Sequence, residues 1–295
     1  MTSFRYLHLD VFAARRGGGN HLGVVTDARE WSDAAMQAFA RWTNLVETTF
    51  LLPPTDPKAS YRVRMFTPHR EIDFAGHPSV GSAHAALACG LVEPRDGLLW
   101  QECRAGVLPI RVEGGGEDHP LLLRSPAATV LEHGLDTHPL LRPALAGVAA
   151  AGLAPALVDG GRRWWVVECA NEAALRQWQP DHTAIGALGK ATASMGICAF
   201  ARSDAADHQL VVRALASGAG ITEDPASGAA NGLLAAYLVQ AEPHGPLARG
   251  YAVSQGREIG YDARLLIRID DDGAVWVGGH TNTVVDGTLN WNANA

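Results

Sequence analysis

Residues 76–83 read GHPSVGSA, and residues 223–230 read EDPASGAA. Each segment sets a proline directly after a chemically active residue, His77 or Asp224, and then continues with small residues. From 77 to 224 the offset is 147 residues, about half of the 295-residue chain. Self-similarity at a fixed offset is the mark of a repeated structural unit. The two segments therefore predict two similar halves.

The flanking sequences repeat in the same order. A strand-like VRMF at 63–66 precedes the first segment, and VRAL at 212–215 precedes the second. LPIRV at 108–112 and LLIRI at 265–269 end the two halves as further strand-like runs. We expect a mixed fold of α and β elements with domains over residues 1–124 and 125–295, leaving open a return of the last strand to the first domain.

Composition excludes several classes of protein. Hydrophobic residues make up 47% and charged residues 19%, which suffices for full cores and excludes a mainly disordered chain. The formal charge of −7 argues against nucleic acid or an acidic membrane as a partner. No apolar run approaches the ~20 residues of a spanning helix, and no signal peptide is evident, so we expect a cytoplasmic protein.

The cysteines and tryptophans give no sign of a cofactor or a nucleobase site. The four cysteines are far apart without a C-x-x-C pair, which predicts reduced, packed thiols and no disulfide frame or zinc site. His69, His77 and His84 lack the spacing of a shared metal ion, so a metal hydrolase is disfavoured. The eight tryptophans accompany no basic groove and are expected in the core. These residues therefore predict neither a shared metal ion nor a nucleobase site.

Helices are expected over residues 32–42, 78–89, 171–178 and 225–239, with more numerous short strands between them. In the two repeated segments proline suits the first helical turn, which puts His77 and Asp224 at the N-caps. If the halves face each other about a pseudo-two-fold, both helix N-termini point into one cleft. Their amides and dipoles would then favour a carboxylate or another small anion.

Glu47 is the candidate acid or base. It stands in NLVETTF, residues 44–50, between an expected helix end and an apolar strand. A carboxylate beside an enclosed cleft can carry protons to and from carbon. A solvated helix-to-strand turn is the plainer interpretation of the same residues. The corresponding place in the second half, near residues 194–196, has no acid, so two equivalent bases are not expected.

Taken together, several strings resemble the PhzF phenazine-biosynthesis-like family in order along nearly the whole chain. They are DVF at 10–12, GN at 19–20, NLVETTF at 44–50, FTP at 66–68, FAGHPSVG at 74–81 and EDPASG at 223–228. The resemblance implies the diaminopimelate-epimerase-like fold: two similar domains, each a mixed β-sheet curled around a central helix, with the site between them. It also implies a homodimer and no cofactor.

For the chemistry, the resemblance implies an isomerase that relocates a proton on a small carboxylated substrate. Glu47 matches the general acid/base, and His77 and Asp224 match the residues that hold the polar groups of the substrate. The backbone near Gly76 and His77 and near Gly228 and Ala229 matches the carboxylate cradle. Ser79 and Val46 are expected beside the ligand as well.

The chain departs from the family pattern at three places. Val46 replaces the serine before the acid/base, Ala229 replaces a second serine, and His21 replaces the proline of Gly-Asn-Pro. Loss of two hydroxyls disfavours the phenazine intermediate as substrate, because its polar groups would be left unpaired. The change at His21 is expected to alter the local turn and not the chemistry.

Two other functions stay open. An amino-acid racemase or epimerase on this fold uses a pair of cysteines, one from each half, but neither repeated segment contains one. A non-catalytic protein that binds a small molecule is the second alternative. Retention of Glu47, His77 and Asp224 together argues against it, since binding alone does not need all three.

Overall fold

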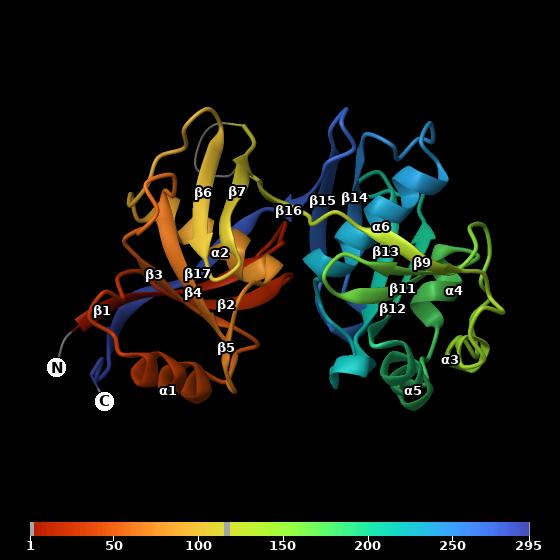
Figure 1. Ribbon diagram of the computed structural model, residues 1–295, viewed down its shortest axis with the longest axis horizontal. Coiled ribbons are helices and arrows are strands. Elements are labelled where there is room, and N and C mark those ends of the chain that lie inside the picture. The colour runs from red at the N-terminus through yellow and green to blue at the C-terminus, as the bar shows by residue number, and fades with distance from the viewer. Residues whose placement is uncertain (1–2, 115–118, 295) are drawn as a thin grey trace. The chain divides into compact units, whose positions relative to one another are not determined.

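The computed structural model describes residues 3–114 and 119–294, and the chain divides into two compact units (Figure 1). The first unit comprises Met1–Arg124 with Gly278–Ala295, and the second comprises Ser125–Val277. Both contain helices and a mixed β-sheet, which confirms the expected α+β class. Among the described residues, no helix combines the length and apolar character needed to cross a membrane.

Nine strands and two helices form the first unit within the described residues. They are β1 (Ser3–Val11), β2 (Asn20–Val25), α1 (Asp33–Thr43), β3 (Thr48–Leu52), β4 (Tyr61–Phe66), β5 (Glu71–Ile72), α2 (Gly76–Ala88), β6 (Leu98–Cys103), β7 (Gly106–Val112), β8 (Leu121–Arg124) and β17 (Thr281–Asn290). The short β5 pairs with the end of β4. β17 joins the unit by pairing along the whole of β1.

The second unit holds the remaining elements. They are β9 (Thr129–His133), α3 (Leu141–Ala144), β10 (Ala156–Asp159), β11 (Arg163–Glu168), α4 (Glu172–Gln177), α5 (His182–Thr192), β12 (Ser194–Arg202), β13 (Leu210–Leu215), η1 (Ser217–Ala219), α6 (Gly228–Ala241), β14 (Gly250–Gln255), η2 (Arg257–Ile259) and β15 (Ala263–Ile269). β16 (Val275–Gly279) leads from this unit back to the first.

Strand pairing follows the same order in both units. In the first, β17, β1 and β2 are antiparallel, β2 and β3 parallel, β3 and β4 antiparallel, β4 and β6 parallel, and β6 and β7 antiparallel. In the second, the series β9, β10, β11, β12, β13, β14, β15 alternates identically. A helix follows the fifth strand of each series, α2 or α6. This shared order agrees with a duplicated sequence.

Helix α2 is the buried helix of the first unit. It contacts β1, β2, β3, β4, β6, β8 and β17, and the strands surround it in Figure 1. A Cβ at Gly81 would stand 2.5 Å from a methyl of Leu22 and 2.9 Å from one of Val11. Glycine at this position therefore lets the helix approach the sheet more closely than any other residue would.

Helix α6 has the same place in the second unit, where it contacts β10, β11, β12 and β15. Its sequence, GAANGLLAAYLVQA, is apolar around nearly its whole circumference, and most of its residues are buried. A helix that is hydrophobic on all sides belongs in a core, and the strands of the unit cover it. Each sheet thus packs against one central helix.

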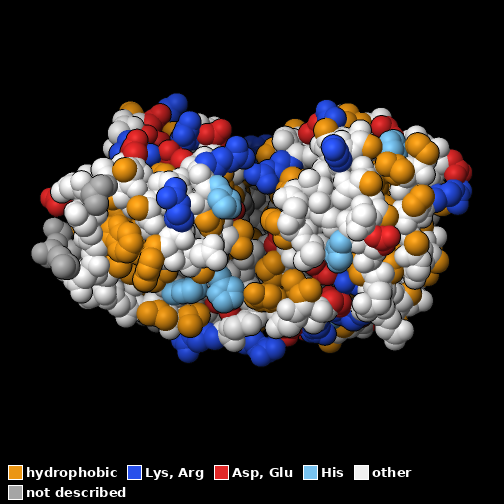
Figure 2. Space-filling model, turned by 90° about the horizontal axis from the view of Figure 1, so that it is seen from below, with side chains coloured by type: hydrophobic (Ala, Val, Ile, Leu, Met, Phe, Trp, Pro, Cys, Tyr) orange, Lys and Arg blue, Asp and Glu red, His pale blue; other side chains and the backbone are white. Residues whose placement is uncertain are grey.

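Helix α1 carries an aromatic cluster on the outside of the first unit. Phe39 packs edge-on against Trp31 and Phe50 in the core, and Trp42 stacks on Phe39 from the surface. Trp42 is 68% exposed and also contacts Trp291 near the chain end. Figure 2 views the molecule from the side on which α1 lies and shows hydrophobic side chains gathered there. This cluster fastens α1 to the sheet.

Candidate active site

The first unit brings Glu47 and His77 together. Oε2 of Glu47 lies 3.5 Å from Nε2 of His77, and the two side chains are only 13% and 8% exposed. Helix α1 ends at Thr43, and the left-handed backbone of its C-cap Asn44 (φ 52°) turns the chain. Glu47 comes immediately before β3. His77 lies in the first turn of the buried helix α2. Two residues 30 positions apart in sequence thus form one acid–imidazole pair.

The His77 ring is oriented by the backbone. Its Nε2 lies 3.2 Å from the carbonyl oxygen of His21, in β2. A carbonyl can only accept, so Nε2 carries the proton and donates it. The same nitrogen faces Glu47 Oε2, which makes Glu47 the second acceptor near that proton.

His21 and His8 form a second imidazole contact next to this one. His8 Nε2 and His21 Nδ1 are 3.3 Å apart, and their rings meet edge to face. Burial lowers the pKa of His8, and the neighbouring His21 lowers it further. The lowered pKa favours the neutral form of the His8 ring at neutral pH.

The start of α2 differs from the sequence-based prediction. The N-cap is Ala75, which offers no side chain to the helix, and His77 is the second helical residue instead of the cap. Ala75 has extended backbone (φ −151°, ψ 148°), and the carbonyl of Ala75 already accepts from the amide of Ser79 at 3.2 Å. The helix thus begins two residues earlier than expected, and the His77 side chain is available for the contact with Glu47.

Ser79 lies in the core and not on an open surface. It is fully buried; its hydroxyl donates to the Ala75 carbonyl at 2.8 Å and accepts from Gln101 Nε2 at 3.0 Å. The Gln101 Oε1 in turn accepts from Tyr61. These bonds hold the first turn of α2, and the contact of Ser79 with a substrate stays a prediction.

In the second unit Asp224 precedes the helix instead of capping it. Helix α6 begins at Gly228 behind Ser227, whose hydroxyl accepts from the Ala230 amide. Asp224 lies at a bridge, where its amide donates to the Ala214 carbonyl at 2.9 Å and its Oδ1 accepts from the Ala226 amide at 3.1 Å. Serine caps a helix as well as aspartate does, and the bridge to β13 holds Asp224 outside the helix.

A buried ion pair anchors the residue before Asp224. Arg213 on β13 donates from Nε and Nη2 to the two oxygens of Glu223 at 3.0 and 2.8 Å, with both side chains nearly inaccessible. Its Nη1 donates to the carbonyls of Leu175 and Trp178. Sequence analysis noted both Arg213 and Glu223 in the repeated strings but did not predict their pairing. Arg64 and Glu71 form the same two-bond contact in the first unit.

In each unit a glutamine side chain forms hydrogen bonds with the repeated segment. Gln255 at the end of β14 donates to the Asp224 carbonyl at 2.8 Å and accepts from Asn231 Nδ2 at 2.9 Å. In the first unit, Gln101 on β6 donates to the Ser79 hydroxyl. Neither glutamine was predicted as part of the site, although each occurs in the strand that follows the central helix of its unit.

The remaining predicted site residues lie at the surfaces of their units. Val46 is 51% exposed, Ala229 is exposed, and Gly76 and Gly228 are half-buried at the first turns of α2 and α6. Val46 directly precedes Glu47, and Ala229 follows Gly228. Contact of these residues with a ligand stays a prediction.

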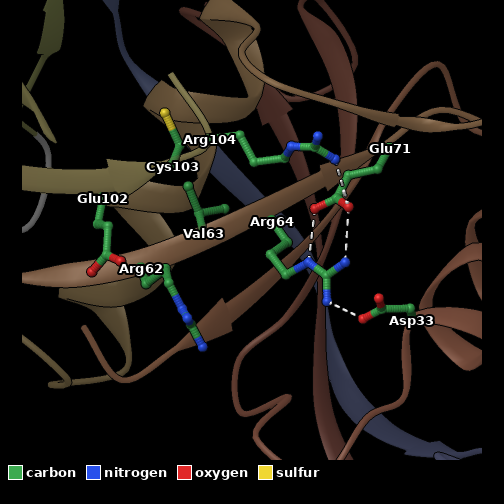
Figure 3. A pocket seen from close by; sticks show the side chains of 8 residues that line it. All are labelled: Asp33, Arg62, Val63, Arg64, Glu71, Glu102, Cys103 and Arg104. Atoms are coloured by element: carbon green, nitrogen blue, oxygen red, sulfur yellow. Dashed lines mark hydrogen bonds and ion pairs between the residues drawn. The ribbon is translucent and has the colours of Figure 1, made fainter. Parts of the chain in front are cut away.

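A pocket of about 430 Å³ lies elsewhere in the first unit (Figure 3). Eight residues line it: seven from α1, β4, β5 and β6, and Arg104 directly after β6. Arg64 joins Glu71 and Asp33 across it, and Arg104 adds a further bond to Glu71. Glu102 accepts from the Thr55 and Asp56 amides. Its acids are thus committed to partners within the protein, and neither Glu47 nor His77 lines it.

The thiols are not placed for acid–base chemistry. Cys169 and Cys198 are buried, and burial raises the pKa of each to about 12. Burial also raises the pKa of Cys89 and Cys103. Among the described residues, no set of three or more His, Cys, Asp or Glu side chains has the arrangement of a metal site. The buried thiols Cys169 and Cys198 therefore stay protonated at neutral pH.

Comparison with known proteins shows likeness over the whole chain. The family model described as phenazine biosynthesis-like protein, PhzC-PhzF, matches residues 9–287. The chain is 30% identical to Antisense-enhancing sequence 1 of Schizosaccharomyces pombe, covering 97% of this chain and 99% of the relative. It is 31% identical to the trans-2,3-dihydro-3-hydroxyanthranilate isomerase of Pseudomonas aeruginosa, covering 96% and 98%.

Solved structures show the same fold. A Bacillus anthracis phenazine biosynthesis protein of the PhzF family superposes with a TM-score of 0.83 at 23% identity, over 98% of this chain and 100% of that one. A probable proline racemase from Agrobacterium radiobacter superposes with a TM-score of 0.63 at 15% identity, over 98% and 93%. The fold is thus shared with PhzF proteins and with proteins of the racemase and epimerase type.

Proposed function

The chain belongs to the phenazine biosynthesis-like (PhzF) family and is an isomerase, and from this premise we propose that it relocates a proton on a small carboxylated, possibly cyclic substrate by general acid/base catalysis without a cofactor. Glu47 takes the proton from one carbon and returns it to another. The bond broken and the bond formed are both C–H bonds, so no oxidant, reductant or co-reactant is consumed. Substrate and product are isomers.

One observation carries the proposal: Glu47 and His77 form a close pair within an enclosed part of the first unit. Their 3.5 Å separation and low exposure support a carboxylate that works away from bulk water. There its charge interacts more strongly with a reacting C–H group and with imidazole than it would in solvent. His77 orients a polar group of the substrate and assists the transfer.

Asp224 is proposed to hold a second polar group of the substrate. Its position before α6 is fixed by the bridge to Ala214, the turn to Ala226 and the bond from Gln255. Such a held carboxylate can accept from an amino or hydroxyl group without reorganising. The shared pairing order of the two units supports the duplication on which this role rests, and the pseudo-two-fold relation is part of the same proposal.

The carboxylate of the substrate is assigned to the starts of α2 and α6. The first amides of a helix have no partner within the helix, and the helix dipole favours negative charge there. Gly76 and Gly228 leave these amides accessible because they carry no side chain. The backbone amide of Ala229 is assigned to the same carboxylate-binding site. The side chains of Val46 and Ala229 are apolar where the family pattern has serine hydroxyls.

The two apolar positions bear on the substrate. The isomerase of Pseudomonas aeruginosa is named for trans-2,3-dihydro-3-hydroxyanthranilate, whose amino and hydroxyl groups need partners. We place the natural substrate of this chain among less polar carboxylic acids. An amino-acid epimerase that uses two cysteines has less support, because the buried thiols keep their protons. A protein that only binds its ligand remains the other alternative.

The proposal includes a homodimer in the cytoplasm, with a small carboxylate as the partner and no nucleic acid, membrane or metal. These features rest on the family and on the net charge of −7. Light scattering at micromolar protein tests the dimer directly. A mass of one chain would remove the dimer from the proposal without touching Glu47.

The test is carbon-bound hydrogen exchange in heavy water. The protein is incubated with a panel of small amino and hydroxy carboxylic acids, trans-2,3-dihydro-3-hydroxyanthranilate among them, and C–H signals are followed by proton NMR. Loss or migration of a signal with the wild type, but not with Glu47→Gln, supports the proposal. Silence across the panel, with binding still visible as line broadening, favours the non-catalytic alternative.

A further inference from the structure

Asp10 has a contact pattern that no catalytic role explains. It is the last but one residue of β1 and only 5% exposed. Its Oδ2 accepts from the amides of Gly17 at 2.6 Å and Gly18 at 3.0 Å, and its Oδ1 accepts from the amide of Gly19 at 2.7 Å. Three consecutive backbone donors converge on one carboxylate, an arrangement that binds anions elsewhere in proteins.

This loop is shaped to fit the carboxylate. Gly17 adopts φ +87°, which favours glycine. A Cβ at Gly19 would stand 2.1 Å from the Val11 carbonyl oxygen and 2.8 Å from Asp10 Oδ1. Phe12 is also held at φ +63° although it is bulky and buried, a conformation that persists only where the surrounding structure imposes it. The segment between β1 and β2 is therefore set by several constraints at once.

The loop leads directly to the His77 contact. Gly19 is followed by Asn20 and then by His21, which pairs with Asp10 across β1 and β2. The carbonyl of His21 accepts from His77 Nε2, the nitrogen that faces Glu47. Asp10 is thus linked to the acid–imidazole pair by three hydrogen bonds from the Gly17–Gly19 amides, by the backbone from Gly19 to His21, and by the hydrogen bond from His77 to the His21 carbonyl.

We propose that Asp10 is a positioning residue: by holding the Gly17–Gly19 amides it fixes the His21 carbonyl, and the carbonyl fixes the tautomer and orientation of His77 beside Glu47. The inference rests on the proposed function for its catalytic consequence only. The state of the His77 ring is a property of the protein without substrate. Holding the loop requires a side chain with two accepting oxygens. An asparagine would turn its NH2 group, a donor, toward at least one of the Gly17–Gly19 amides, which are donors themselves.

Asp10→Asn is the first variant. Its side-chain NH2 opposes at least one loop amide, so the loop moves and the His21 carbonyl moves with it. In long-range proton–nitrogen NMR spectra of the ligand-free protein, wild-type His77 shows the Nε2-protonated tautomer. Asp10→Asn shows a mixture of tautomers. On the panel acid that the wild type exchanges, kcat falls at least tenfold, and KM and the affinity for 3-hydroxyanthranilate change less than threefold.

Gly17→Ala is the second variant, since nothing lies within 4 Å of the added Cβ and only the strain of φ +87° acts. It keeps the carboxylate, folds, and shows a smaller shift of the same His77 signals. The matched control is Glu168→Gln, another buried carboxylate that accepts from a backbone amide, of Leu153, and from Arg202. It leaves the His77 signals and kcat unchanged.

Wild-type His77 signals and kcat in Asp10→Asn would overturn the proposal. If Asp10→Asn does not fold, Gly17→Ala decides by the same two measurements, and unchanged signals there have the same meaning. The proposed function fails on a different result, namely turnover by Glu47→Gln. Failure of the Asp10 proposal and failure of the proposed function can therefore be distinguished.

Discussion

The Nε2 of His77 lies between two acceptors, the His21 carbonyl at 3.2 Å and Glu47 Oε2 at 3.5 Å. An imidazole held in this way presents a fixed ring to the substrate and a fixed dipole to the carboxylate. A neutral imidazole can thus assist Glu47 without exchanging its own proton with it. In the proposed mechanism Glu47 is therefore the group whose protonation changes during the reaction.

Glu47→Gln therefore removes the proton carrier while preserving shape. We expect kcat to fall at least about 100-fold, the lower range for loss of a general acid/base. Binding of 3-hydroxyanthranilate and the melting temperature should stay close to wild type, because glutamine has nearly the same size as glutamate and its amide oxygen can still face His77. Glu47→Asp should retain part of the activity. The exposed Glu30→Gln is the control, and turnover by Glu47→Gln equal to that control removes Glu47 from the mechanism.

Val46→Ser and Ala229→Ser restore two hydroxyls at accessible positions. If both face the ligand, each offers a hydrogen bond worth about 0.5–1.5 kcal/mol. Affinity for 3-hydroxyanthranilate should then rise about threefold to tenfold for each substitution. Isothermal titration measures it, with Val284→Ser on exposed β17 as the control. Equal affinities in all variants would show that positions 46 and 229 do not contact the ligand.

The cysteines separate the two kinds of isomerase. Because burial raises the pKa of Cys169 and Cys198 to about 12, both remain thiols at neutral pH. Iodoacetamide at pH 8 should leave exchange activity intact, and Cys169→Ala with Cys198→Ala should cost stability but not kcat. An enzyme that uses a cysteine pair would lose turnover in both experiments. Mass spectrometry confirms which thiols reacted.

The helices α2 and α6 could be predicted from the sequence because similar strings, each with a proline followed by small residues, occur at the start of both. The first residues of these helices could not be predicted. Ser227 is the N-cap of α6 because the hydrogen bond between the Asp224 amide and the Ala214 carbonyl holds Asp224 outside the helix. That bridge is a tertiary contact, and cap preferences alone do not contain it.

Helix α5 shows the same limit. Its sequence, HTAIGALGKAT, holds two glycines, which lower helix propensity, and sequence analysis did not predict it. A Cβ at Gly189 would stand 2.7 Å from the Gly218 Cα, in η1, and 2.9 Å from the Ser194 carbonyl oxygen. Because Gly189 has no side chain, η1 can pack closely on the helix.

The burial of Ser79 and the hydrogen bonds of Gln101 and Gln255 likewise depend on contacts between segments that are distant in sequence.

The Arg64–Glu71 pair makes stability depend on pH. Two hydrogen bonds from Arg64 hold the pKa of Glu71 below its usual range. A lowered pKa stabilises the fold above the carboxyl pKa of the unfolded chain, near 4.3, and this contribution disappears as pH falls through the lower value in the folded state. Arg64→Met should lower the free energy of unfolding by about 1–3 kcal/mol at pH 7. The difference from wild type should narrow as pH falls below about 4. Urea unfolding measures it, with the exposed Arg29→Met as control.

The Arg213–Glu223 pair is buried and should behave differently. Glu223→Gln leaves a buried guanidinium without its charge partner, which costs about 3–5 kcal/mol. Arg213→Met leaves a buried carboxylate and, in addition, the carbonyls of Leu175 and Trp178 without their donor, so it should cost as much or more. The double variant Arg213→Met with Glu223→Met removes both charges and should be less unstable than the sum of the single changes.

Activity distinguishes a purely structural pair from one that also sets the site. Glu223 directly precedes Asp224, so a displaced Glu223 shifts the carboxylate proposed to hold the substrate. We expect Glu223→Gln, assayed below its melting temperature, to raise KM more than it lowers kcat, because binding is affected and Glu47 is not. A variant that is less stable but has wild-type KM would show that Gln255 and the bridge to Ala214 suffice to hold Asp224.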